Sequence, residues 1–296
     1  MGSLRDRLAA GDIVLIDGAT GTELERLGVP MREGAWCGDV VRTHPDVLRA
    51  VHEAHIAAGA ELIITNTFAT HRHLLAFGGI EQHFELLNRR SVEVALEARD
   101  RAGNPDVAVA ASMSTSRQGG TPPPLAVARD NFAEQAEILA AAGADLFVLE
   151  MMRDLDETQL CIDAAAATGL PIWLGWSCVA ADRPEPLLYE KAQTLRQGMA
   201  AIEGQPIDVV AIMHTEVEEV DACLDVLDET WDGPVGVYAH SGDFVPPNWI
   251  FNDIISADDY CAHCLRWVAR GVQVVGGCCG ITDAHIAVLR DALAAR

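Results

Sequence analysis

Two adjacent cysteines, Cys278 and Cys279, are the residues of this chain whose type and spacing most directly indicate chemistry. They lie in the segment 276–280, which reads GGCCG. Zinc binds thiolate sulfur, and a catalytic zinc keeps one coordination position open. The flanking glycines let the backbone turn until both sulfurs face one point. The pair therefore predicts a site for a soft metal ion. Two unconnected thiols and a strained vicinal disulfide are the alternatives that these residues leave open.

The other six cysteines are scattered along the chain, and we expect them to be reduced thiols. Cys261 and Cys264 have a CxxC spacing, which also occurs at metal sites. The segment around them, residues 258–265, reads DDYCAHCL and has the pattern of a helix. We predict that both are buried helix cysteines, because small apolar thiols pack well there.

The elements that position these residues alternate regularly along the chain. Short apolar segments rich in β-branched residues predict strands, and longer amphipathic segments predict the helices between them. The predicted strands are residues 13–16, 62–65, 107–111, 146–149, 172–176, 209–213, 235–238 and 272–275. The clearest predicted helices are residues 47–58, 84–98, 132–142 and 217–227.

Eight strand-and-helix units in a chain of 296 residues predict an α/β fold, a single (β/α)8 TIM barrel. The strands are apolar along their whole length, which is typical of a parallel sheet covered on both faces. An open doubly wound sheet is the alternative. The stretch richest in Gly and Pro, residues 119–124, is predicted to be a single loop after the third strand. We therefore predict one domain over residues 1–296.

Polar residues that closely follow the predicted strands are the candidates for a functional site, because the active site of such a barrel lies at the carboxyl ends of its strands. In strand order they are Asp17 and Thr20, Asn66, Ser112, Glu150, Ser177, His214, His240, and finally Cys278 with Cys279. Each also has a simpler interpretation. A turn or cap explains Asp17, a salt bridge explains Glu150, and local turn hydrogen bonds explain the amide and hydroxyl side chains. His214 and His240 are explained as histidines at strand ends that bind no metal.

Four segments resemble the homocysteine S-methyltransferase family in order and spacing. They read DGATGTEL over residues 17–24, AGAELIITNTF over 58–68, LE over 149–150 and GGCCG over 276–280. The resemblance runs from about residue 12 to residue 292, and the DGATGT and GGCCG segments are its most specific marks. It implies a zinc-dependent enzyme that moves a methyl group from a sulfonium or betaine-type donor to homocysteine, giving methionine.

The resemblance also implies a ligand set for the zinc ion. In the family three thiolates bind zinc, one after the sixth strand and two after the eighth; Cys278 and Cys279 match the latter pair. Where the family usually has Asn-Cys after the sixth strand, this chain has Met213 and His214. We predict that His214, Cys278 and Cys279 bind the metal, with His240 as a candidate fourth ligand. Two thiolates and an imidazole make an uncharged site and a more electrophilic ion than three thiolates do.

The predicted metal ligands come from strands that are not adjacent. His214 lies two strands away from the cysteine pair, roughly 10 Å across the ladder. We expect inward-facing side chains to close that gap, and the longer reach of an imidazole, compared with a thiol, to place the ion closer to the eighth strand than a cysteine would.

The acceptor site is implied by the same resemblance. Asp17 and Glu150 match the family residues that hold the amino group of homocysteine. The backbone N–H groups of Gly18, Ala19 and Thr20 are expected to receive its carboxylate, as anion-binding turns do. The predicted substrate-binding residues are completed by Asn66 and Ser112. No protein side chain is predicted to act as a general base.

Charge and hydropathy exclude several classes of partner. The chain has 44 acidic and 21 basic residues, a formal net charge of −23, which repels nucleic acid and anionic lipid headgroups. It contains no apolar run of about 18 residues, and its first ten residues include Arg5, Asp6 and Arg7 without a signal-like apolar segment. We expect a cytoplasmic protein that binds a small thiol acceptor and a small methyl donor; whether it is a homo-oligomer is left open.

Other functions are compatible with the altered ligand set. One is a family member that methylates a different thiol or selenol, or that takes the methyl group from a partner corrinoid protein. The other is a barrel that binds zinc or an amino acid without turnover. Metal analysis combined with a methyl-transfer assay would separate them.

Overall fold

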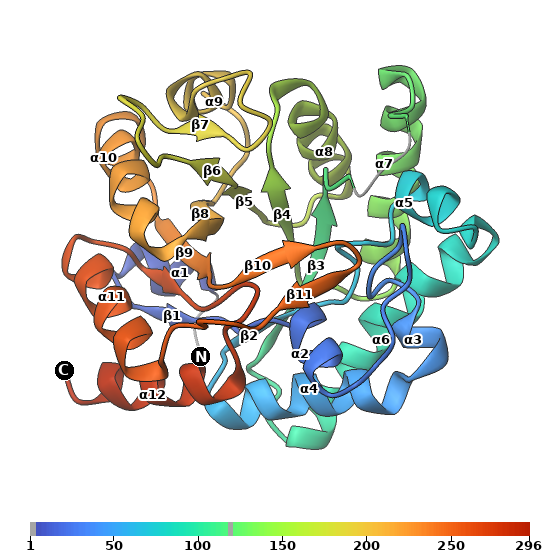
Figure 1. Ribbon diagram of the computed structural model, residues 1–296, viewed down its shortest axis with the longest axis horizontal. Coiled ribbons are helices and arrows are strands. Elements are labelled where there is room, and N and C mark those ends of the chain that lie inside the picture. Colours follow the sequence, from blue (N-terminus) through green and yellow to red (C-terminus); the bar gives the residue numbers. More distant parts are fainter. Residues whose placement is uncertain (1–3, 118–120) are drawn as a thin grey trace.

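A ring of eight parallel strands forms the centre of the computed structural model, which describes residues 4–117 and 121–296 (Figure 1). The strands are β1 (Val14–Leu15), β2 (Leu62–Ile64), β3 (Ala108–Ser114), β4 (Leu146–Met152), β5 (Ile172–Trp176), β8 (Val209–Glu216), β9 (Val235–His240) and β12 (Val274–Val275). Around the ring they follow the order β1-β12-β9-β8-β5-β4-β3-β2. A parallel bridge between Ile16 and Leu62 joins the two ends. The predicted (β/α)8 barrel is confirmed, and the open sheet is wrong.

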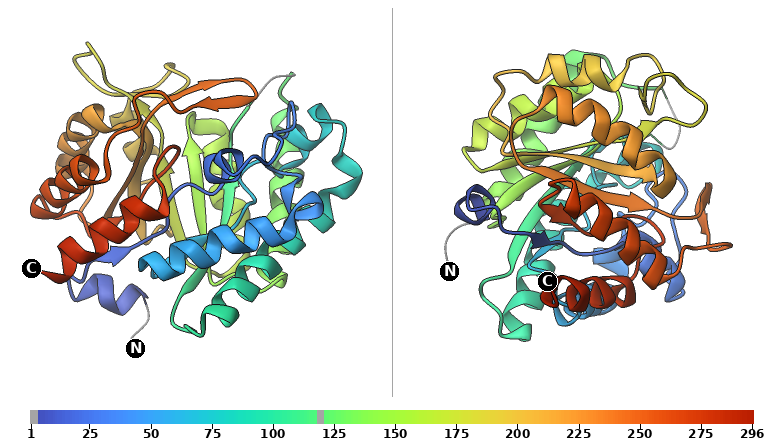
Figure 2. Two further views of the ribbon diagram at one scale, coloured as in Figure 1. Left: turned by 60° about the horizontal axis from the view of Figure 1, so that its bottom comes forward. Right: turned by 90° about the vertical axis from the view of Figure 1, so that its left-hand side faces the viewer.

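Helices between the strands cover the outside of the ring (Figures 1 and 2). They are α2 (Gly21–Arg26), α3 (Val40–Thr43), α4 (Pro45–Ala58), α5 (Arg72–Phe77), α6 (Phe84–Ala102), α7 (Leu125–Ala141), α8 (Leu155–Thr168), α9 (Leu195–Ala201), α10 (Val220–Thr230), α11 (Ala257–Ala269) and α12 (Asp283–Ala294), with α1 (Leu4–Ala9) before the first strand. The CxxC cysteines lie on α11 and are buried, as predicted.

The helix limits differ from the prediction mainly at α7 and α10. Helix α7 begins at Leu125, directly after Pro124 at its N-cap, and not at residue 132. Its first turns are largely exposed, so the apolar periodicity did not mark them. Residues 217–219 form a separate 3-10 turn before α10. The predicted loop at residues 119–124 lies partly outside the described residues.

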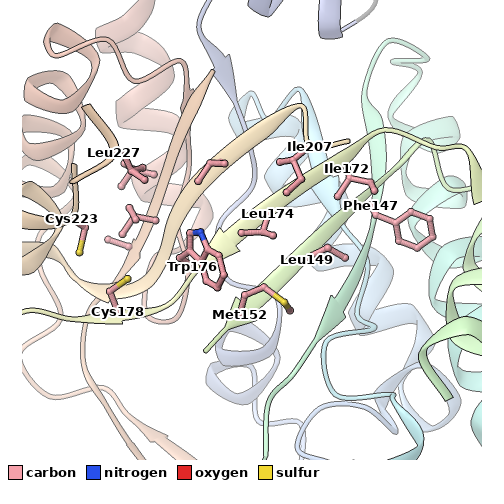
Figure 3. Packing of buried hydrophobic residues seen from close by; sticks show 14 of the residues in the cluster. Phe147, Leu149, Met152, Ile172, Leu174, Trp176, Cys178, Ile207, Cys223 and Leu227 are labelled. Carbon is pink, nitrogen blue, oxygen red and sulfur yellow. The ribbon is translucent and has the colours of Figure 1, made fainter. Parts of the chain in front are cut away.

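Successive side chains along each strand point to opposite faces of the sheet, so the core has two layers. On β4, Leu146 and Val148 face the barrel interior, whereas Phe147 and Leu149 pack in the layer between the strands and the helices. Figure 3 shows part of this outer layer, including Leu149 beside Leu174 of β5. Because both faces of each strand are buried, the strand sequences read as continuous apolar runs.

Two hairpins lie outside the ring. The first pairs β6 (Cys178–Val179) with β7 (Leu187–Leu188), and the second pairs β10 (Asp243–Val245) with β11 (Asn248–Ile250). The backbone N–H of Trp249 in β11 donates to the Glu25 carboxylate of α2, 3.0 Å to Oε2. This bond holds the second hairpin across the mouth of the barrel, where it appears in orange in Figure 2. Among the described residues, no helix has the length and apolarity needed to cross a membrane.

Candidate metal and substrate site

A β-bulge at the end of β4 positions Glu150. The register of β4 against β5 shifts between Leu149 and Met152, and Met151 has a φ of 52°. A left-handed backbone costs a non-glycine residue roughly 1 kcal/mol or more, and such strain persists where the surrounding structure fixes it. Glu150 therefore lies within the strand, not after it as predicted, because the bulge lets β4 continue.

A second bulge at the end of β8 positions His214. The register against β9 shifts between Met213 and Glu216, and His214 has a φ of 43°. The Ser177 hydroxyl donates to the His214 carbonyl over 2.8 Å. Bulges beside active sites commonly re-aim one side chain. His214 too lies within its strand, which extends three residues beyond the predicted end at 213.

The glycines before the cysteine pair are required by close packing. A Cβ at Gly276 would lie 2.2 Å from Cγ1 of Ile16, and a Cβ at Gly277 would lie 2.2 Å from Cγ2 of Ile281. Only residues without a side chain let the segment after β12 run this close to β1. The backbone is thereby fixed in a path that places both cysteines at the barrel mouth.

The structure brings His214, Cys278 and Cys279 together. The Nδ1 atom of His214 lies 3.6 Å from Sγ of Cys278, and the two sulfurs lie 3.9 Å apart. All three ligand atoms lie within 4.8 Å of one another. Tetrahedral zinc at ordinary bond lengths needs N–S and S–S separations of about 3.6 and about 3.8 Å. The cluster fits such an ion, and its two sulfurs, 3.9 Å apart, are not joined in a disulfide.

The protonation states of these side chains also suit a cation. Burial, with His240 nearby, lowers the pKa of His214 well below its usual range, so the imidazole is neutral and has a free lone pair. The contact with Cys278, together with burial, raises the pKa of Cys279 well above that of an ordinary thiol. This thiol ionises at neutral pH only beside a compensating positive charge, which a divalent metal supplies.

His240 lies beside the cluster without joining it. The centroids of its ring and the His214 ring are 4.4 Å apart. Its Nε2 shares a hydrogen bond of 2.9 Å with Oε1 of Glu216, and its buried Nδ1 has no partner among the described residues. The three-residue cluster includes neither nitrogen of His240. The arrangement thus has three protein ligand atoms, and not a closed set of four.

Asp17 and Glu150 are buried acidic groups for which the described part of the chain provides no salt-bridge partner. Asp17 accepts the N–H of Ile64 at Oδ2 over 2.7 Å, and its Oδ1 has no partner in the described chain. Glu150 accepts the hydroxyl of Ser112. Burial raises the pKa of Asp17 well above its usual range, with the Glu150 charge adding to the effect, and burial raises the pKa of Glu150 to about 7. The salt bridge considered for Glu150 is not found among the described residues. An ammonium group would stabilise both carboxylates.

The backbone N–H groups after β1 are arranged differently from the prediction. The N–H of Gly18 faces Nδ1 of His55 at 3.4 Å, and the N–H of Ala19 donates to the Ile281 carbonyl over 2.8 Å. Two of the three expected carboxylate donors are therefore already engaged by the protein. Thr20 has no such backbone partner in the described chain, and all three residues line the pocket.

The remaining predicted residues form hydrogen bonds to other residues in or beside the site. The Asn66 amide donates to the Cys37 carbonyl over 2.9 Å and accepts the Cys37 thiol at 3.1 Å, while lining the pocket. Ser112 holds Glu150, and Ser177 holds the backbone of His214. The latter two act on the groups that face the pocket.

Aromatic and basic side chains that the sequence analysis did not single out as site residues complete the pocket wall. The aromatic members are Trp36, Phe68, Tyr189, Phe244 and Trp249, and the basic ones are Arg117 and Arg153. The ring of Trp249 lies 6.1 Å from that of His214, and so does the ring of Tyr189. Most come from loops that fold back over the mouth. For Phe244 and Trp249 the sequence signal was the concentration of aromatic residues around the Pro246-Pro247 turn, and Phe68 ends the segment 58–68 noted above.

Comparison with known sequences places this site in a family. The model of homocysteine S-methyltransferase sequences matches residues 14–293. The homocysteine S-methyltransferase of Escherichia coli (strain K12) is 29% identical over 310 residues, covering 97% of each chain. The selenocysteine Se-methyltransferase of Brassica oleracea var. italica is 25% identical over 318 residues, covering 97% of this chain and 90% of its own.

A solved structure agrees with the sequence comparison. The homocysteine methyltransferase MmuM from Escherichia coli, in a crystal structure of its metallated form, superimposes with a TM-score of 0.81 at 26% identity. The match covers 98% of this chain and 100% of that one. With the barrel, the cysteine pair and the sequence match in agreement, this chain is a methyltransferase and belongs to the homocysteine S-methyltransferase family.

Proposed function

We propose that this protein transfers a methyl group from a sulfonium or quaternary-ammonium donor to the sulfur of homocysteine, giving methionine, and that it requires zinc. The observation that carries this proposal is the cluster of His214, Cys278 and Cys279 in the same pocket as the cation-free carboxylate of Glu150. A thiol amino acid needs one group for its sulfur and one for its ammonium. Relatives named for homocysteine support this acceptor.

His214, Cys278 and Cys279 would hold the zinc ion, because their separations and donor types fit it. When bound there, zinc supplies the thiolate form of the acceptor at neutral pH. Asp17 and Glu150 would hold the acceptor ammonium and so fix the direction of its side chain. We also propose that residues 1–296 form one domain, since the described chain builds one barrel.

The transfer itself needs alignment more than proton movement. The acceptor sulfur attacks the donor methyl carbon in line with the bond that breaks. The sulfur electron pair forms the new C–S bond, and the old bonding pair stays on the donor heteroatom, which becomes neutral. No proton moves in this step, so no protein base is required. The aromatic wall beside His214 would hold the onium cation against the acceptor, and this alignment accounts for much of the rate.

A methyl-transfer assay with metal analysis tests the proposal. Zinc-loaded protein should convert homocysteine to labelled methionine when given S-methylmethionine or betaine carrying a deuterated methyl group. Chelated protein should lose the activity and regain it with zinc. Zinc binding without transfer to homocysteine from either donor would contradict the proposal.

Methylation of a selenol or a different thiol is the second candidate. It is favoured by the histidine at position 214 and by the relative named selenocysteine Se-methyltransferase. A competition between homocysteine and selenocysteine decides between the two, because the better acceptor has the higher kcat/KM. Methyl transfer only from a corrinoid protein, or no turnover, would identify the remaining alternatives.

A further inference from the structure

Arg153 is a buried cation whose hydrogen bonds are incomplete. Its side chain is 4% exposed and lines the pocket. Nη1 forms a salt bridge of 2.8 Å with Oε1 of Glu190. Nε and Nη2 are buried and have no acceptor among the residues that the structure describes. A guanidinium presents five N–H donors in a fixed plane, and donors left unpaired in a buried place are costly.

The unpaired atoms of Arg153 form one edge of the guanidinium. Nε and Nη2 point in the same direction, and together they make the two parallel bonds with which arginine binds a carboxylate. The opposite side of the group is held by Glu190. Burial lowers the pKa of Arg153, against the opposite effect of Glu190. A planar anion in the pocket would complete the site.

Arg153 is not one of the proposed acceptor groups, although it lines the same pocket. It follows β4, three residues beyond Glu150, and three extended residues span up to roughly 10 Å. The acceptor ammonium is assigned to Asp17 and Glu150, and its sulfur to the cysteine cluster. Arg153 lines the same pocket and belongs to neither group, so its unpaired edge is available to the second substrate.

An aromatic side chain lies between the partner of Arg153 and the metal cluster. Tyr189 precedes Glu190 directly, and its ring lies 6.1 Å from the ring of His214. One short segment thus places an aromatic face near the cluster and, at the next residue, the carboxylate that holds Arg153. With Trp249 also near His214, the wall is suited to a cation, and the guanidinium of Arg153 in the same pocket has an edge without an acceptor among the described residues.

We propose, building on the function proposed above, that Arg153 binds a carboxylate of the methyl donor. The donor is then a zwitterion, with its onium group against the aromatic wall and its carboxylate on the Nε and Nη2 edge of Arg153. Arg153 acts as a specificity residue, and it selects donors that carry an anion at the far end from the reacting methyl group.

Paired donors that differ only in the carboxylate test this proposal. The zinc-loaded enzyme is assayed with S-methylmethionine and with its carboxamide, using wild type, Arg153→Met and Arg153→Lys. Wild type should prefer the carboxylate form by about 10- to 100-fold in kcat/KM, the scale of a charge-assisted pair. Arg153→Met should lose that preference by slowing only the carboxylate donor. Arg153→Lys should keep part of it, because the charge remains but the fork is lost.

The controls separate donor recognition from structural damage. Arg196→Met removes an exposed arginine with two surface ion pairs, and it should keep the wild-type preference. Zinc content and the KM for homocysteine should be the same in all variants. An equal fall for both donors in Arg153→Met would overturn the proposal, and so would a rise in KM for homocysteine alone, which would assign the arginine to the acceptor.

A binding measurement keeps the proposal separate from the proposed reaction. Calorimetric titration of the zinc-loaded protein with glycine betaine and with betaine amide compares the affinities for a carboxylate and for a carboxamide without turnover. Tighter binding of the carboxylate form, abolished by Arg153→Met, would support the site even if no transfer to homocysteine occurred. Equal affinity of wild type for the two compounds would overturn it.

Discussion

Replacing Glu150 by glutamine should stabilise the ligand-free protein at high pH. Burial raises the pKa of Glu150 to about 7 in the folded protein, against an ordinary value of 4.5. Because the folded pKa is the higher one, the folded state binds the proton more tightly. The penalty is absent below about pH 4.5, grows as the pH rises, and is complete above about pH 7. The difference corresponds to about 3 kcal/mol.

The Glu150→Gln variant should therefore gain up to about 3 kcal/mol in the free energy of unfolding at pH 8, and only about 1 kcal/mol at pH 5. The amide keeps an acceptor for the Ser112 hydroxyl. Urea unfolding at the two pH values, with equal metal content, measures both numbers. Glu203→Gln, at an exposed position, is the control and should change neither.

The same substitution should impair acceptor binding. Glutamine cannot balance an ammonium, so the KM for homocysteine should rise by the equivalent of about 1 to 3 kcal/mol, the scale of a lost charge-assisted hydrogen bond. Zinc content should not change. No gain in stability at pH 8 would mean that the Glu150 charge is already compensated in the free protein. A wild-type KM would mean that Glu150 does not face the acceptor. Either result would refute the reasoning.

Three further substitutions test the rest of the site. Asp17→Asn should also raise the KM for homocysteine, by about 1 to 3 kcal/mol, because Oδ1 would no longer be a charged partner; an unaltered KM in steady-state assays would assign this carboxylate elsewhere. Cys278→Ser and Cys279→Ser should each lose the zinc that wild type binds at about one ion per chain by elemental analysis, and full retention in the double variant would remove the metal assignment. His214→Ala should weaken zinc binding by one to several orders of magnitude in chelator competition. His214→Cys should keep the metal and raise the rate of homocysteine methylation, because a third thiolate makes the bound acceptor sulfur more nucleophilic. A metal-loaded His214→Cys enzyme with no gain in rate would contradict that reasoning.

The strands were predictable because their environment is uniform. Each predicted strand overlaps the observed one, since parallel strands covered on both faces need unbroken apolar runs. The ends of β4 and β8 were not predictable. Their bulges depend on positive φ at Met151 and His214, and neither residue type signals that conformation as a glycine would.

The inner residues of the site were easier to predict than the outer ones. Asp17 lies two residues after β1 and Cys278 three residues after β12, so the topology of the barrel alone directs them to the mouth. Tyr189 and Trp249 reach the pocket from the segments that carry the two hairpins outside the barrel, whereas Arg153 directly follows β4, whose end the sequence had placed at Leu149. No local pattern says where such a segment returns, because its path is determined by contacts such as that between Trp249 and Glu25.

His214 approaches the cysteine pair through the ring nitrogen nearer its backbone. Strand β9 separates β8 from β12, so a gap of roughly 10 Å must be closed. The atom that faces Cys278 is Nδ1, the ring nitrogen nearer the backbone and only one bond further from Cβ than a cysteine sulfur. The length of the imidazole therefore contributes little. The register of β8 against β9 shifts at His214, whose φ is positive, and such a bulge re-aims the side chain that it carries. A thiol at position 214 would start from the same backbone and end close to the present nitrogen, which is why His214→Cys should retain the metal without any shift of the barrel.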